Sequence, residues 1–288
     1  MTSTQPPTSD QPTKKNDPFV TPNFLTRALT SIILAPLVLI GAYVQGVLWL
    51  VMMLIIGIIG VLEFYTITDQ SPKRGSSVIG VIGVVMMVLG AYFQQPLAVI
   101  GALAGVMVMS YVIARIVAPK FSLHIMLITL SGVIYVGLVA TFLVDISHLN
   151  KAFVWLLLIC VSTWGADTAA YVGGRLWGKR KLAPSLSPNK TIEGAVTGII
   201  SSIFFGVVIL WVGNIFSIPA LIMVIIMPFM AILGDLFESA LKRYFDVKDS
   251  HLHGVNLVPG HGGVLDRIDS LIFVTLFCYT WMWLFDLI

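Results

Sequence analysis

Charged residues are scarce in this chain. Only 11% of its 288 residues are Asp, Glu, Lys or Arg, whereas a soluble domain carries about 25%. The net charge is also small, at +3, and the basic residues stand in short clusters beside apolar runs. This distribution argues against a nucleic-acid partner. It favours an anionic membrane surface and phosphate-bearing ligands.

Cysteine is almost absent, and so are the features of a cleaved leader. Cys160 and Cys278 are the two cysteines, and both fall inside apolar runs, which argues against a disulfide framework or a cysteine-based zinc site. Residues 1–24 are polar and Pro-rich, without an apolar core or an Ala-x-Ala site, so they do not resemble a signal peptide. We expect residues 1–24 to form a disordered cytoplasmic tail.

Apolar sequence, in contrast, is abundant: 57% of the residues are hydrophobic, and the mean hydropathy is +0.95. Runs of about 17 to 25 apolar residues can cross the hydrocarbon core as helices, and the runs here are too continuous for a membrane barrel. The predicted fold class is an all-α, polytopic integral membrane protein with nine transmembrane helices. The predicted helices cover residues 28–44, 47–65, 78–93, 97–117, 123–146, 152–173, 194–212, 218–237 and 270–288.

The basic residues predict the orientation of these nine helices. If the N-terminus is cytoplasmic, sixteen of the 17 Lys and Arg residues fall on the cytoplasmic side and only Lys151 falls outside, as the positive-inside rule requires. The C-terminus is then external. Residues 25–288 form the membrane domain, and its two large loops, residues 174–193 and 238–269, face the cytoplasm, where a water-soluble nucleotide could reach them.

Acids, bases and glycines concentrate in two segments between the last apolar runs, residues 239–249 and 257–270. Charges at a membrane boundary are costly unless they are solvated, paired or bound to an ion, so such a cluster indicates a functional site. On a helix, the spacing of Asp235, Glu238 and Lys242 places them on one face, and Asp266 and Asp269 repeat that spacing. The two faces should point toward each other.

Paired carboxylates at one membrane depth suit a hard divalent cation such as Mg²⁺. Asp235 and Asp266 are the first candidate ligands, followed by Asp269 and Glu238. The alternative is a set of salt bridges from Asp266 or Asp269 to Arg267, Lys242 or Arg243. Asp167, near the end of the sixth run, is a further candidate ligand, and its alternative is a structural pair with Arg175.

The glycines of Pro259-Gly-His-Gly-Gly263 allow backbone amides to approach an anionic group closely. Between Lys242-Arg243 and Asp266-Arg267 the motif predicts a phosphate cradle. A turn at the membrane boundary explains the proline and the glycines equally well, and His261 would then only cap the next helix.

The order of these motifs resembles the signature of the CTP:phosphatidate cytidylyltransferases, also called CDP-diacylglycerol synthases. It consists here of Ser239-Ala-Leu-Lys-Arg243, Lys248-Asp249 and Pro259-Gly-His-Gly-Gly-Val-Leu-Asp-Arg-Ile-Asp269. Residues 167–175, 177–184 and 187–194 also resemble segments of this family. One departure is the spacer after Lys248-Asp249, which has nine residues where the family pattern has about five.

The resemblance implies transfer of a cytidylyl group from CTP to phosphatidate, in a bacterial inner membrane. The catalytic candidates are Asp235, Asp266, Lys242, Arg243 and His261. The substrate phosphate-binding candidates are Lys190, Lys242, Arg243, Gly262, Gly263 and Arg267. Mg²⁺, with room for a second cation, would be held by Asp235 and Asp266, with Asp269 and Asp167 as further ligands.

Two other functions compete with this one. An ion-coupled transporter would use intramembrane carboxylates as cation ligands, but it predicts acids near mid-membrane and internal repeats. A CDP-alcohol phosphotransferase would need an Asp-Gly-x-x-Ala-Arg motif, which the sequence lacks. A separate pattern, Gly101-x-x-x-Gly105, is typical of close helix contacts, either between two copies in a homodimer or within one chain.

Overall fold

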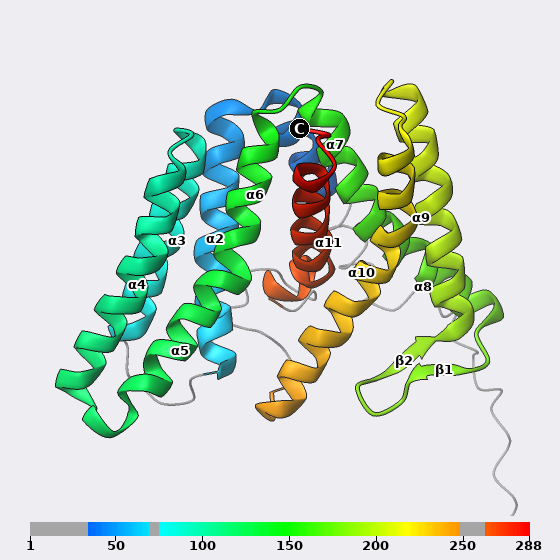
Figure 1. The fold of residues 1–288 in the computed structure, drawn as a ribbon. Helices are drawn as coiled ribbons and strands as arrows, with labels where there is room; N and C mark the ends of the chain where they lie inside the picture. Colours follow the sequence, from blue (N-terminus) through cyan, green and yellow to red (C-terminus); the bar gives the residue numbers. More distant parts are fainter. Residues whose placement is uncertain (1–33, 69–74, 248–262) are drawn as a thin grey trace, which may run out of the picture.

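The computed structural model describes residues 34–68, 75–247 and 263–288. Helices dominate this part of the chain (Figure 1), which confirms the predicted all-α class. The predicted tail, residues 1–24, lies outside the described residues. The α-helices are the segment Leu34–Val44, α2 Gly46–Thr68, α3 Gly75–Tyr92, α4 Pro96–Val117, α5 Ser122–Gly132, α6 Leu138–Ser147, α7 Ala152–Cys160, α8 Ala166–Trp177, α9 Ile192–Val212, α10 Ile218–Tyr244 and α11 Leu265–Leu284.

Two pairs of these helices join into longer rods through short π-helical segments. The segment η2, Val133–Gly137, connects α5 to α6, and η3, Val161–Gly165, connects α7 to α8. A π-helical turn widens the helix locally and is frequent at functional sites. A short 3₁₀ turn, η1 Pro119–Phe121, precedes α5.

Every predicted membrane run overlaps a helix, and six helical rods are long and apolar enough to cross a membrane. They are Gly46–Thr68, Pro96–Val117, Pro119–Ser147, Ala152–Trp177, Ile192–Val212 and Ile218–Tyr244. Two shorter apolar helices are Leu34–Val44 and Ser77–Tyr92. Helix α11 is 20 residues long and has three charged residues among its first five. A polytopic membrane protein is thus confirmed, while nine crossings and their orientation stay predictions.

Three helices extend furthest beyond the predicted limits. Helix α8 continues to Trp177 rather than 173, α10 continues to Tyr244 rather than 237, and α11 begins at Leu265 rather than 270. The predicted runs stopped where apolar residues stopped, whereas a helix satisfies its own backbone hydrogen bonds and continues into charged sequence. Asp235 and Glu238 therefore lie within α10, and Asp266 lies in the first turn of α11.

Between α8 and α9 the chain forms a small antiparallel hairpin. Strand β1, Lys181–Ala183, pairs with β2, Ser187–Thr191. Among the described residues these are the only strands. In Figure 1 the hairpin stands at the edge of the bundle, at the end of α8 and beside α10.

Two close helix crossings determine where the acids lie. At Gly234 of α10, an added Cβ would lie 2.6 Å from the carbonyl oxygen of Asp269 on α11, so only glycine permits this approach. At Gly194 of α9, an added Cβ would lie 2.6 Å from the carbonyl oxygen of Ala170 on α8. The first crossing places Asp235 beside α11, and the second holds the base of the hairpin against α8.

Candidate functional site

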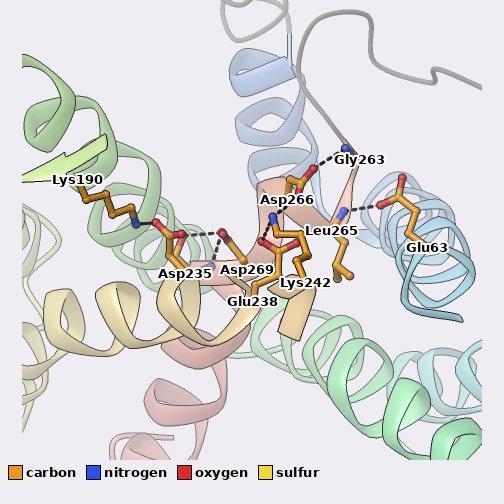
Figure 2. Close-up of polar contacts among 10 residues, drawn as sticks. Glu63, Lys190, Asp235, Glu238, Lys242, Gly263, Leu265, Asp266 and Asp269 are labelled. Atoms are coloured by element: carbon orange, nitrogen blue, oxygen red, sulfur yellow. Dashed lines mark hydrogen bonds and ion pairs between the residues drawn. The ribbon is translucent and has the colours of Figure 1, made fainter. Parts of the chain in front are cut away.

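Lys242 joins the charged faces of α10 and α11 (Figure 2). Its Nζ lies 3.0 Å from Glu238 Oε2 on the same helix and 2.6 Å from Asp266 Oδ1 on α11. The three side chains are largely buried, with exposed fractions of 15%, 1% and 12% for Lys242, Glu238 and Asp266. The two faces meet, as predicted, and Lys242 forms a salt bridge with Asp266, one of the pairs considered as an alternative to a metal site.

Asp235, one turn before Glu238, forms an ion pair with Lys190 of β2. Figure 2 shows the Lys190 side chain reaching from the hairpin toward α10, and the carboxylates of Asp235 and Asp269 pointing toward each other. Partial burial lowers the pKa of Lys190, while the carboxylates of Asp167 and Asp269 act in the opposite direction. The hairpin thus places the Lys190 ammonium group near acids of α8, α10 and α11.

The base of the hairpin is fixed by Glu193, the second residue of α9. Its Oε2 accepts hydrogen bonds from the backbone amides of Lys179 and Arg180, at 3.0 and 3.1 Å, and its Oε1 lies 3.1 Å from Arg180 Nε. These bonds hold both ends of the hairpin together at the start of α9. We expect them to limit the positions that Lys190 can reach.

Asp167 of α8 faces the first turns of α11. The hydroxyl of Ser270 lies 3.5 Å from Asp167 Oδ2 and 3.2 Å from Asp269 Oδ1. Nearby, the indole of Trp164 in η3 donates to the carbonyl oxygen of Arg267, at 3.0 Å. Arg175, the alternative partner considered for Asp167, donates from Nη1 to the Tyr171 hydroxyl at 2.7 Å.

The N-terminus of α11 is held by a carboxylate that the sequence analysis missed. Glu63 of α2 is 1% exposed, and it accepts hydrogen bonds from the amides of Val264, at 3.0 Å, and Leu265, at 2.6 Å. The preceding amide, of Gly263, donates to Asp266 Oδ2 at 2.8 Å. A single acid inside the second apolar run was the available signal, and it is the same signal that singled out Asp167.

The remaining candidates differ in position. Arg243 is exposed in the last turn of α10 and forms no ion pair with an acid in the described part of the chain. Arg267 is exposed in the first turn of α11. His261 and Gly262 lie outside the described residues, as does the nine-residue spacer.

Asp235 and Asp167 lie farther from the ends of their helices than the sequence predicted. Asp235 precedes the end of α10 by nine residues, and Asp167 precedes the end of α8 by ten, which corresponds to about 13–15 Å along a helix. These positions along α10 and α8 do not by themselves exclude a transporter. That distinction comes from the family of the chain.

The carboxylates suit Mg²⁺ only with additional ligands. Among the described residues, no three His, Cys, Asp or Glu side chains are arranged to hold a metal ion by themselves, and Asp235 and Asp266 each contact a lysine. Glu238 Oε1, however, is buried without a hydrogen-bond partner in this part of the chain. Because Mg²⁺ usually takes one or two carboxylates and completes its shell with water and substrate phosphates, the donor set fits such an ion.

Comparison with known proteins identifies the family of this chain. The model of the cytidylyltransferase family matches residues 25–285. The phosphatidate cytidylyltransferase of Staphylococcus epidermidis (strain ATCC 35984) is 33% identical over 260 residues, which cover 86% of this chain and 95% of that protein. The protein of the same name from Staphylococcus aureus (strain COL) is 31% identical over 258 residues, covering 87% and 94%.

A third relative matches a shorter region. The phosphatidate cytidylyltransferase of Bacillus subtilis (strain 168) is 41% identical over 163 residues, which cover 55% of this chain and 58% of that protein. The family match, in contrast, extends over most of the described helices and includes every charged side chain of the site. This chain belongs to the cytidylyltransferase family.

Proposed function

We propose that the protein is a phosphatidate cytidylyltransferase, which makes CDP-diacylglycerol and pyrophosphate from CTP and phosphatidate. The observation that carries this proposal is the cluster of acids and lysines that α10, α11 and the hairpin assemble inside a membrane domain. A polar site within apolar helices can bind a lipid phosphate and a nucleoside triphosphate together. Membership of the cytidylyltransferase family and the names of the relatives support these substrates.

In the proposed reaction, a phosphate oxygen of phosphatidate attacks the α-phosphorus of CTP. The bond from that phosphorus to the oxygen bridging the α- and β-phosphates breaks, and pyrophosphate leaves with the electron pair. Such a displacement depends on positioning and charge stabilisation more than on a protein nucleophile. Mg²⁺, when bound, would neutralise charge on the triphosphate.

The side chains of the site have distinct roles in this proposal. Asp235 and Asp266 would hold the cation, with Asp269 and Asp167 as further ligands and Glu238 Oε1 as a buried oxygen nearby. Lys190 and Lys242, which pair with these carboxylates in the structure, would contact the substrate phosphates. Arg243, Arg267, Gly262, Gly263 and His261 remain proposed contacts of the substrate phosphates.

The test is an assay of the purified full-length protein with labelled CTP, phosphatidate and Mg²⁺. We expect pyrophosphate release that requires phosphatidate, stops with a chelator and resumes when Mg²⁺ is restored. Release without the lipid, or no release by protein that is folded and inserted, would contradict the proposed reaction. Ion flux into vesicles containing the protein would instead support a transporter.

The proposed location is a bacterial inner membrane, with the N-terminus in the cytoplasm and the C-terminus outside. The sixteen basic residues predicted on one side support this orientation. A homodimer is also proposed: at Gly101 and Gly105 of α4, an added Cβ would have no described atom within 4 Å, so this face is open to a second copy.

Orientation is directly measurable. Single cysteines placed at Ser9 and after Ile288, in a variant without Cys160 and Cys278, are expected to react with an impermeant thiol reagent from opposite sides of the membrane. Both native cysteines are free and must be replaced to keep the background low. Labelling of both sites from the same side would rule out an odd number of crossings.

A further inference from the structure

We infer that Glu63 is a positioning residue for the reaction: it fixes the N-terminal turn of α11 and, through that turn, the directions of Asp266 and Asp269. The inference rests on the proposed function for its catalytic consequence. Its structural part stands on the contact itself, which joins residues 202 positions apart in the sequence.

The contact satisfies backbone groups that a helix leaves open. The first amides of an α-helix have no partner within the helix, and a carboxylate near the positive end of the helix dipole is favourable. Glu63 Oε1 accepts a hydrogen bond from the Val264 amide at 3.0 Å, and Oε2 accepts one from the Leu265 amide at 2.6 Å. Both oxygens must be correctly placed, so the contact fixes the direction of the chain as well as its distance from α2.

Packing on the same face of α2 leaves little room for adjustment. Gly60 lies one turn before Glu63, and an added Cβ there would lie 3.0 Å from Val136 Cγ1 and 3.5 Å from Ile268 Cδ1. Helix α2 therefore rests directly against the first turn of α11. Since Glu63 is almost fully buried, solvent cannot replace its two bonds at low cost.

The anchored turn carries the acids of the site. Asp266 follows Leu265 directly. Its Oδ2 accepts a hydrogen bond from the Gly263 amide at 2.8 Å, and its Oδ1 accepts one from Lys242 Nζ at 2.6 Å. Asp269 lies one turn later, facing Ser270 and the Asp235 side of the site (Figure 2). In the described part of the chain, the three consecutive amides from Gly263 to Leu265 thus all donate to carboxylates, two of them to Glu63. Releasing Glu63 would free the segment from which Asp266 and Asp269 project.

Glu63→Gln tests this inference. The amide keeps the size of the side chain, but its NH₂ group would face a backbone donor and one bond would be lost. We expect turnover to fall about 10- to 100-fold, because a shift of about 1 Å at a reacting centre has an effect of this size. We also expect faster hydrogen exchange in the first turn of α11, with a KM for CTP that changes much less than turnover.

Asp145→Asn is the matched control. Asp145 is a carboxylate on α6 that also contacts α11, through the Tyr279 hydroxyl at 3.0 Å, but it does so more than two turns beyond the acids. Its variant should keep turnover within about twofold. Equal losses in both variants would assign Glu63 an ordinary structural role and overturn the inference.

Other outcomes are equally decisive. Unchanged hydrogen exchange and unchanged turnover in Glu63→Gln would overturn the inference. If that variant does not insert, Glu63→Asp retains the charge but is shorter by one methylene, and it should show the same fast exchange at Val264 and Leu265. If the wild-type protein transfers no cytidylyl group, the proposed function fails, whereas the exchange measurement still tests the anchor.

Discussion

Asp235→Asn and Asp266→Asn are each expected to lower cytidylyl transfer by at least about 100-fold, because the cation that would neutralise the triphosphate would lose a charged ligand. Both changes keep the size of the side chain. The variants should require more Mg²⁺ for half-maximal activity, or should not be rescued by it. The measurement is turnover of purified, folded protein over a titration of Mg²⁺.

The two variants should differ in stability. Asp266 contacts the buried Lys242 and the Gly263 amide, so its loss should destabilise the start of α11, whereas Asp235 pairs with a lysine on the hairpin. Asp286→Asn, at an exposed position near the C-terminus, is the control and should retain normal activity. Near-normal turnover with unchanged Mg²⁺ dependence in either site variant would remove that residue from the proposed metal site and make Asp269 or Asp167 the next ligand to test.

Lys242→Met should abolish activity and also destabilise the protein, by about 3–5 kcal/mol, because in the described part of the chain Lys242 is the one salt-bridge partner that two buried carboxylates share. Glu238 is 1% exposed and Asp266 is 12% exposed. Without the ammonium, both acids must take up protons or the helices must separate. Resistance to denaturant, measured together with turnover, should reveal both losses.

Two further variants separate charge from shape at this position. Lys242→Arg keeps the charge but not the compact geometry of the ammonium, so we expect it to recover much of the stability and little of the activity. Lys151→Met removes an exposed lysine that donates a hydrogen bond to the carbonyl oxygen of Asn214. This change should leave stability and activity nearly unchanged. A stable, active Lys242→Met protein would show that the acids are neutralised in another way.

Much of the fold could be predicted from the sequence because membrane helices are a local property. A run of apolar residues with internally satisfied backbone bonds predicts a helix without knowledge of its neighbours. The same local reasoning fails at helix ends. Residues 238–244 include three charged side chains, yet they remain helical in α10, so Asp235 lies farther from the end of its helix than predicted.

Part of the site could also be predicted locally. Asp235, Glu238 and Lys242 share a face because of their spacing, and the structure places that face against Asp266. The choice between a metal site and salt bridges could not be made in the same way. Both arrangements use the same residues, and only the distances between α10 and α11 identify the contact from Lys242 to Asp266.

The sequence by itself determined that this is an all-α membrane protein of the cytidylyltransferase pattern, because apolar run length and motif order are properties of neighbouring residues. Only the tertiary structure decided that Lys190 meets Asp235 and that Glu63 holds the start of α11. These contacts depend on where distant helices cross, as at Gly234, where the backbones of α10 and α11 touch. Spacing along one helix places side chains on a face, but it carries no information about which residue of another helix will lie opposite.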